Sequence, residues 1–172
     1  MYTPGNTMPV PDEHGHVNFD ETFASYATAI AAEVDRETGV VTVLDALIVS
    51  DCGVLINPAV VEGQHQGGFA QAVGAVLFEQ AAYDDDGQPR AASFLDYLLP
   101  GAPEVPVLRV VHRETPSAVA GGFRGMAEAT ITATPAALAG AIADALAPLG
   151  VEIDTTRLGA ADVWTLVRAA SA

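Results

Sequence analysis

The chain has 172 residues, the size of one ordinary domain, and a chain of this length can bury roughly 70% of the surface that it exposes when unfolded. Half of the residues are hydrophobic, and 22 acidic residues stand against seven arginines and no lysine, for a formal net charge of −15. This composition excludes intrinsic disorder, and the scarcity of basic residues argues against nucleic acid or an anionic membrane as a partner.

Cys52 is the single cysteine of the chain. A disulfide, a Cys-rich zinc site and an iron–sulfur cluster held by this chain alone are therefore excluded. The first residues show no signal-peptide pattern, and no run of about 18 apolar residues is uninterrupted. We therefore expect a cytoplasmic protein with no membrane partner. Residues 1–21 are rich in Pro, Gly and His and are interpreted as an arm or docking segment, followed by a single domain over residues 22–172.

A β-hairpin and a long helix are predicted for the first half of that domain. The runs 22–34 and 40–50 are compatible with strands. The segment between them ends at Gly39, and glycine adopts the positive φ of a turn without steric cost. Asn57 followed by Pro58 is typical of a helix start. We expect a helix of about 20 residues from this point.

Small residues recur at helical spacing in this helix. Gly63, Gly67, Ala70 and Gly74 fall on one stripe. Because glycine in a helix interior costs up to about 1 kcal/mol relative to alanine, the stripe indicates either tight helix–sheet packing or the close approach of backbone or a ligand. Both interpretations, tight packing and close approach, stay open at this point. Beside the stripe, Gln64 and Gln71 are spaced to point the same way.

The second half is predicted to contain two extended segments and two helices. The extended segments are 92–99 and 105–113, separated by a bend rich in Pro and Gly. Thr134 and Pro135 are expected to cap a helix over 136–149, and residues 160–170, which carry Trp164, are expected to form a short closing helix. The predicted fold class is α+β, with a mixed sheet and packed helices.

Glu128 is the most plausible catalytic side chain by its setting. It follows a glycine-containing run, Gly121 to Gly125, lies near Arg124 and precedes a predicted helix. Such a carboxylate is a candidate general base, although an exposed loop glutamate is the more common meaning of this pattern. The four histidines have no spacing that builds a metal site, so we assign them structural or surface roles and predict no metal ligands in this chain.

Several short motifs follow one another in a fixed order from about residue 22 to about residue 149. They include Asp51-Cys52-Gly53, Ile56-Asn57-Pro58, Gly63-Gln64, Gly67-Gly68, Gln71-Ala72-Val73-Gly74 and Gly122-Phe123-Arg124-Gly125-Met126-Ala127-Glu128. In this order they resemble the C-terminal part of the molybdopterin-binding subunit of the xanthine dehydrogenase/aldehyde oxidase family, the molybdenum hydroxylases. The resemblance implies the α+β fold of that subunit's C-terminal molybdopterin-binding domain.

The resemblance also implies a site. Glu128 falls where the family has its base beside the molybdenum, and Gln71 falls where a glutamine contacts the pterin of the molybdopterin-type cofactor. Gln64, Gly67 and Gly125 are further candidates for cofactor binding. Ala72 and Ala127 stand where the family usually has glycine, and each is expected to add a methyl group near the cofactor.

The family's subunit is several times longer than this chain, so the resemblance implies partners. We expect a larger chain that carries the rest of the molybdenum domain and shares the cofactor, and partner subunits with FAD and [2Fe–2S] clusters. This chain would then be a natural split subunit or a fragment of an oxidoreductase that is active only with those partners. The implied reaction on a small-molecule substrate is hydroxylation of an aldehyde or N-heterocycle, or oxidation of a related substrate, with oxygen from water. The alternative is a non-catalytic assembly or small-molecule-binding module.

Overall fold

The computed structural model describes residues 7, 10–18, 20 and 22–171. Part of the expected N-terminal arm therefore lies outside the described residues, and the division into an arm and a single domain stays a prediction. The elements in chain order are β1 (Ser25–Val34), β2 (Val41–Asp51), α1 (Pro58–Leu77), β3 (Leu108–Arg113), α2 (Ala129–Leu146), a 3-10 turn (Ala147–Leu149) and α3 (Ala160–Ala170).

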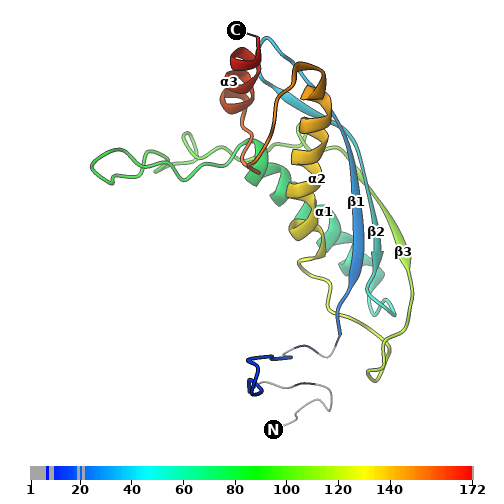
Figure 1. Cartoon of the computed structure of the whole chain (residues 1–172). Helices are drawn as coiled ribbons and strands as arrows, with labels where there is room; N and C mark the ends of the chain where they lie inside the picture. The colour runs from blue at the N-terminus through cyan, green and yellow to red at the C-terminus, as the bar shows by residue number, and fades with distance from the viewer. Residues whose placement is uncertain (1–6, 8–9, 19, 21, 172) are drawn as a thin grey trace.

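Three strands form a mixed sheet in the order β1-β2-β3. β1 and β2 are antiparallel, as the hairpin prediction required, and β3 pairs with β2 in parallel. Burial alternates along β1, and α1 and α2 lie on one side of the sheet (Figure 1). The α+β fold with a mixed sheet and packed helices is therefore confirmed.

The turn between β1 and β2 depends on Gly39. This residue has a φ of 76°, and a Cβ built on it would collide with the backbone of Ala160 and Trp164 at the start of α3. Just before α3, Leu158 donates a backbone hydrogen bond of 2.8 Å to Val76 near the end of α1. The closing helix is thus fixed both to the hairpin and to α1.

Helix α1 begins where Asn57 and Pro58 predicted. The Asn57 side chain accepts a hydrogen bond from the Val60 amide at 3.3 Å, and the helix ends at Leu77, after 20 residues. One face of α1 is buried in the hydrophobic core, which contains residues from every helix and from β2 and β3. Its largest fully buried apolar side chains are Phe69, Ile48, Leu108, Leu138, Ile142, Leu146, Leu158, Val73, Val76 and Val163.

The extended segment expected over 92–99 is wrong. These residues form bends and a turn, in which the amides of Asp96 and Tyr97 both donate to the Ser93 carbonyl. The Ser93 hydroxyl donates to the Asp96 carboxylate at 2.8 Å. These local hydrogen bonds satisfy the backbone without a partner strand, which is why the apolar pattern was misleading.

The start predicted for α2 is also wrong. The helix begins at Ala129, seven residues earlier, so Thr134 is buried inside it and Pro135 lies in its interior. Proline lacks the N–H that would reach the Ile131 carbonyl. Packing of the buried first turn against α1 outweighs this loss. Ala129–Leu149 is long and apolar enough to cross a membrane, which is equally a property of core helices, and Leu138 and Ile142 lie in the core.

Candidate functional site

The loop that leads to Glu128 is attached to the end of β2. Val54 donates to the Gly122 carbonyl at 3.0 Å, and Arg124 donates from its backbone to the Cys52 carbonyl at 2.7 Å. Gly53 pairs with Phe123 in an isolated antiparallel bridge. Through these contacts, residues more than 60 positions apart hold the segment before α2 in place.

Two charged side chains strengthen this attachment. The Arg124 guanidinium donates to the carbonyls of Phe23 and Thr115. Asp51 accepts from the amides of Gly53 at 3.0 Å and Thr115 at 3.1 Å. Hydrogen bonds from Thr115 and Gly53, assisted by the nearby positive charge of Arg124, lower the pKa of Asp51 to about 2. Asp51 is therefore a carboxylate that orders the loop.

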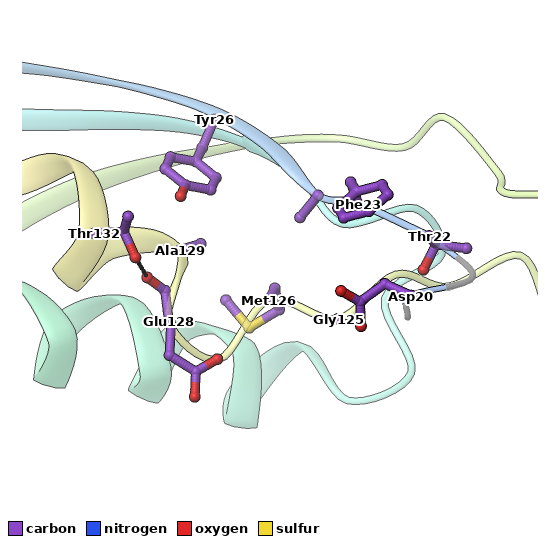
Figure 2. Close-up of a pocket in the computed structure, with 10 residues that line it drawn as sticks. Asp20, Thr22, Phe23, Tyr26, Gly125, Met126, Glu128, Ala129 and Thr132 are labelled. Carbon is purple, nitrogen blue, oxygen red and sulfur yellow. Dashed lines mark hydrogen bonds between the residues drawn. The ribbon is translucent and has the colours of Figure 1, made fainter. Parts of the chain in front are cut away.

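A cavity of about 310 Å³ lies between the start of β1 and the start of α2 (Figure 2). Glu128 and Gly125, both candidates from the sequence, line it together. Tyr26 points its ring into the cavity from β1 (Figure 2). Sequence reasoning missed the other lining residues, which are Asp20, Thr22, Phe23, Ala24, Tyr26, Met126, Ala129 and Thr132.

Glu128 is exposed and forms the N-cap position of α2. Its carbonyl accepts hydrogen bonds from the Thr132 hydroxyl at 2.6 Å and the Thr132 amide at 3.1 Å. Its carboxylate makes no hydrogen bond to any described residue, and it is directed away from the Tyr26 ring (Figure 2). The backbone of Glu128 is thus fixed while its carboxylate is available for another group.

The other candidates, Gln64, Gly67 and Gln71, lie on the exposed side of α1 and do not line this cavity. We call these three residues the glutamine face. A Cβ added to Gly67, or to Gly63 one turn earlier, would meet nothing within 4 Å, so the surface there is open among the described residues. Within the stripe only Gly74 is packed, against the Glu79 and Pro100 side chains.

Ala72 follows Gln71 in α1 and faces the interior of the fold. Its side chain is 0% exposed and belongs to the interior of the fold. Because successive residues of a helix are about 100° apart, Ala72 turns inward while Gln71 faces outward, and the expectation that its methyl group lies near the cofactor stays a prediction. Ala127 is exposed next to Glu128, so the expectation made for that residue stays a prediction.

A polar cluster, buried at His65 and Thr130 and partly exposed at His112 and Glu62, connects α1, β3 and α2. His65 Nδ1 lies 2.6 Å from the Thr130 hydroxyl, the His65 and His112 rings are 5.7 Å apart, and His112 Nε2 lies 3.7 Å from the Glu62 carboxylate. Burial, with the neighbouring His112, lowers the pKa of His65, and Glu62 opposes this change. Sequence reasoning missed this cluster because its members come from distant parts of the chain.

The side chains of the glutamine face and Glu128 suit a molybdopterin-type cofactor in their chemistry. Primary amides both donate and accept hydrogen bonds, as the edge of a pterin requires, and the open surface at Gly63 and Gly67 leaves room for a flat ring system. Among residues 7, 10–18, 20 and 22–171, no group of three His, Cys, Asp or Glu side chains could hold a metal ion. In this chain, amides and one carboxylate would therefore contact the cofactor.

Comparison with known proteins gives one family match and many relatives. The molybdopterin cofactor-binding domain family matches residues 1–106, a range that includes the glutamine face and ends before Glu128. The large subunit of nicotine 6-hydroxylase from Paenarthrobacter nicotinovorans is 45% identical over 129 residues, which are 74% of this chain and 16% of that protein. The chain thus spans about a sixth of the length of this curated relative.

Solved structures agree with this match. Quinoline 2-oxidoreductase from Pseudomonas putida 86 superposes with a TM-score of 0.77 at 43% identity, covering 80% of this chain and 18% of that one. Carbon monoxide dehydrogenase from Oligotropha carboxidovorans superposes with a TM-score of 0.83 at 28% identity, covering 87% and 19%. The chain therefore belongs to the molybdopterin cofactor-binding domain family, within the xanthine dehydrogenase/aldehyde oxidase group of proteins.

Proposed function

We propose that this chain forms part of the molybdenum-cofactor site of a hydroxylase, with Glu128 as the base. The observation that carries the proposal is the state of Glu128. Its backbone is fixed at the start of α2, and its exposed carboxylate has no hydrogen-bond partner among the described residues. A carboxylate held at its main chain and free at its oxygens is what a general base needs.

The cofactor would supply the redox chemistry, while this chain would bind, orient and move a proton. Gln71, with Gln64 beside the open surface at Gly67, would hold the pterin through amide hydrogen bonds. Gly125 would leave space beside Glu128, because a Cβ there would meet nothing within 4 Å. A Glu128 Oε atom would take up the proton released as oxygen from water is transferred to the substrate carbon.

An N-heterocycle is the substrate class that we favour. The relative named for nicotine and the structure named for quinoline are 45% and 43% identical to this chain, against 28% for the carbon monoxide dehydrogenase structure. Both named compounds contain a nitrogen ring with an electron-poor carbon that hydroxylation can target. An aldehyde is the second candidate for the substrate.

The proposed enzyme needs other chains. This chain spans about a sixth of the nicotine 6-hydroxylase large subunit, and its single cysteine cannot hold an iron–sulfur cluster. We infer that a larger cytoplasmic chain supplies the rest of the molybdenum domain and shares the cofactor. Partner subunits with FAD and [2Fe–2S] clusters would remove the electrons.

The experiment compares Glu128→Gln with Asp144→Asn in the assembly of this chain with its larger partner chain. Asp144 is also an exposed carboxylate on α2, which makes it a matched control. With quinoline and nicotine as probes, Glu128→Gln should lower kcat by about 10²- to 10⁴-fold, the usual contribution of a general base. Asp144→Asn should leave kcat unchanged, and both variants should keep their molybdenum content.

Two results would contradict the proposal. Full turnover in Glu128→Gln would exclude Glu128 as the base. An assembly without molybdenum would favour the alternative, a non-catalytic assembly or small-molecule-binding module. Ala127 and Ala72 are the sequence features in favour of that alternative.

A further inference from the structure

The buried hydrogen bond between α1 and α2 lies close to Glu128. His65 Nδ1 and Thr130 Oγ1 are 2.6 Å apart, and the two residues are 0% and 1% exposed. Thr130 is two residues after Glu128, in the first turn of α2. The hydrogen bond therefore joins α1 to the part of α2 that fixes the backbone of Glu128.

Gly68 makes a second contact with the same turn. It lies three residues after His65, on the same side of α1, and is buried. A Cβ added to Gly68 would lie 3.3 Å from both the Ile131 amide nitrogen and Thr130 Cβ, which is tighter than an ordinary contact. The backbone of α2 thus lies directly against α1, and this close approach favours a glycine.

The adjoining, exposed side of α1 carries the glutamine face. Gln64 and Gly67 immediately precede His65 and Gly68, and their side of the helix is exposed while the other is buried. One rigid helix therefore connects the glutamine face to the first turn of α2. The contacts of His65 and Gly68 with that turn therefore help to set the distance between Glu128 and the glutamine face.

We propose that His65, Gly68 and Thr130 form a positioning clamp that fixes Glu128 relative to the glutamine face. This inference rests on the proposed function, in which Glu128 is the base and the glutamine face holds the cofactor. None of the three clamp residues touches the cofactor or the substrate. They act by placing the main chain of Glu128, and a misplacement of about 1 Å can lower a rate by as much as roughly 100-fold.

The protonation state of His65 is compatible with the clamp. Burial, followed by the neighbouring His112, lowers the pKa of His65, and the Glu62 carboxylate is the opposing charge. A neutral ring can accept the Thr130 hydroxyl proton at Nδ1. A buried hydrogen bond of this kind is costly to break, because its removal leaves a desolvated polar atom.

The test compares Thr130→Val with Thr134→Val in the assembly with the larger chain. Both threonines are buried in α2, and the Thr134 hydroxyl has no hydrogen-bond partner among the described residues, so it is the matched control. Thr130→Val should speed amide hydrogen exchange at residues 126–133 several-fold and lower kcat about tenfold or more, with KM within about twofold. Thr134→Val should change neither quantity. Thr130→Ser, which keeps the hydroxyl, should restore both.

A second variant tests the clamp even if Thr130→Val fails to fold. Gly68→Ala introduces a methyl group against the backbone of α2 and should lower kcat severalfold with KM preserved, without removing a polar atom. Exchange at residues 126–133 that is equal in Thr130→Val and Thr134→Val would overturn the clamp. Faster exchange with unchanged kcat would overturn its role in positioning the base. Amide hydrogen exchange does not depend on the catalytic reaction. It therefore still tests the clamp if Glu128→Gln keeps full turnover.

Discussion

Gly53 is the residue on which the loop before Glu128 depends most directly. It has a φ of 68°, and a Cβ there would collide with the Gly122 carbonyl, which accepts the Val54 hydrogen bond. Gly53→Ala should therefore destabilise the chain by more than about 1 kcal/mol, because alanine is strained at positive φ and the collision is with backbone. Urea unfolding of the two proteins measures the difference.

Gly87→Ala is the control for that substitution. Gly87 has a φ of 79°, but a Cβ there would meet nothing within 4 Å. Both substitutions carry the conformational cost of a positive φ, and only Gly53→Ala adds a collision. Equal losses of stability in the two variants would mean that the close approach to Gly122 contributes nothing to the loop.

At the scale of the elements, local sequence signals predicted those parts of the fold that local interactions determine. The hairpin followed from two β-compatible runs around Gly39, and α1 followed from Asn57 and Pro58. The start of α2 did not follow, because packing of Ala129 and Thr130 against α1 outweighs the signal of Pro135. Where the local sequence pattern was ambiguous, packing against another helix determined where α2 begins.

The candidate site also has residues that local sequence predicted and residues that it did not. Glu128 and Gly125 are three positions apart in the sequence, and both line one cavity. The hydrogen bond between His65 and Thr130 joins residues 65 positions apart, and no periodicity or motif indicates such a pair. The burial of Ala72 did not follow from its motif, because the motif gave its position along α1 but not the side that the core would bury.

The contact between α1 and α2 should make stability depend on pH. Burial, with His112 beside it, lowers the pKa of His65 below its ordinary value of 6.5. The unfolded state then binds more protons than the folded state as pH falls below about 6.5, so the free energy of unfolding decreases there and is level above it. Urea unfolding between about pH 5 and pH 8 measures this slope.

His65→Gln should reduce that slope, because it removes the buried titrating group. His16→Gln is the control, since His16 is exposed near the start of the described chain and interacts with Asp12 and His14 beside it. An unchanged slope in His65→Gln would show that another group causes the pH dependence. Glu62 and His112, which face His65, would then be the groups to substitute.

At the scale of the whole molecule, apolar side chains are exposed where the chain leaves the body of the fold. The segment between α1 and β3, residues 78–107, extends away from the helices and the sheet (Figure 1). We call this segment the 78–107 arm, to distinguish it from the N-terminal residues 1–21. Phe94, Leu95 and Val107 on this arm are 84%, 90% and 81% exposed. Exposed apolar residues along one segment of a chain with a net charge of −15 indicate a contact surface rather than a core.

The double variant Phe94→Ser and Leu95→Ser should therefore make the chain more soluble when it is expressed without partners. Its thermal unfolding temperature should change by no more than about 1 °C, because side chains this exposed contribute little to the core. Ile56→Ser is the control, since Ile56 is 74% exposed but lies on the body of the fold just before α1. Light scattering of the purified proteins should show less association for the arm variant than for the control. If the two reduce association equally, general surface hydrophobicity, and not the arm, limits the solubility of this chain.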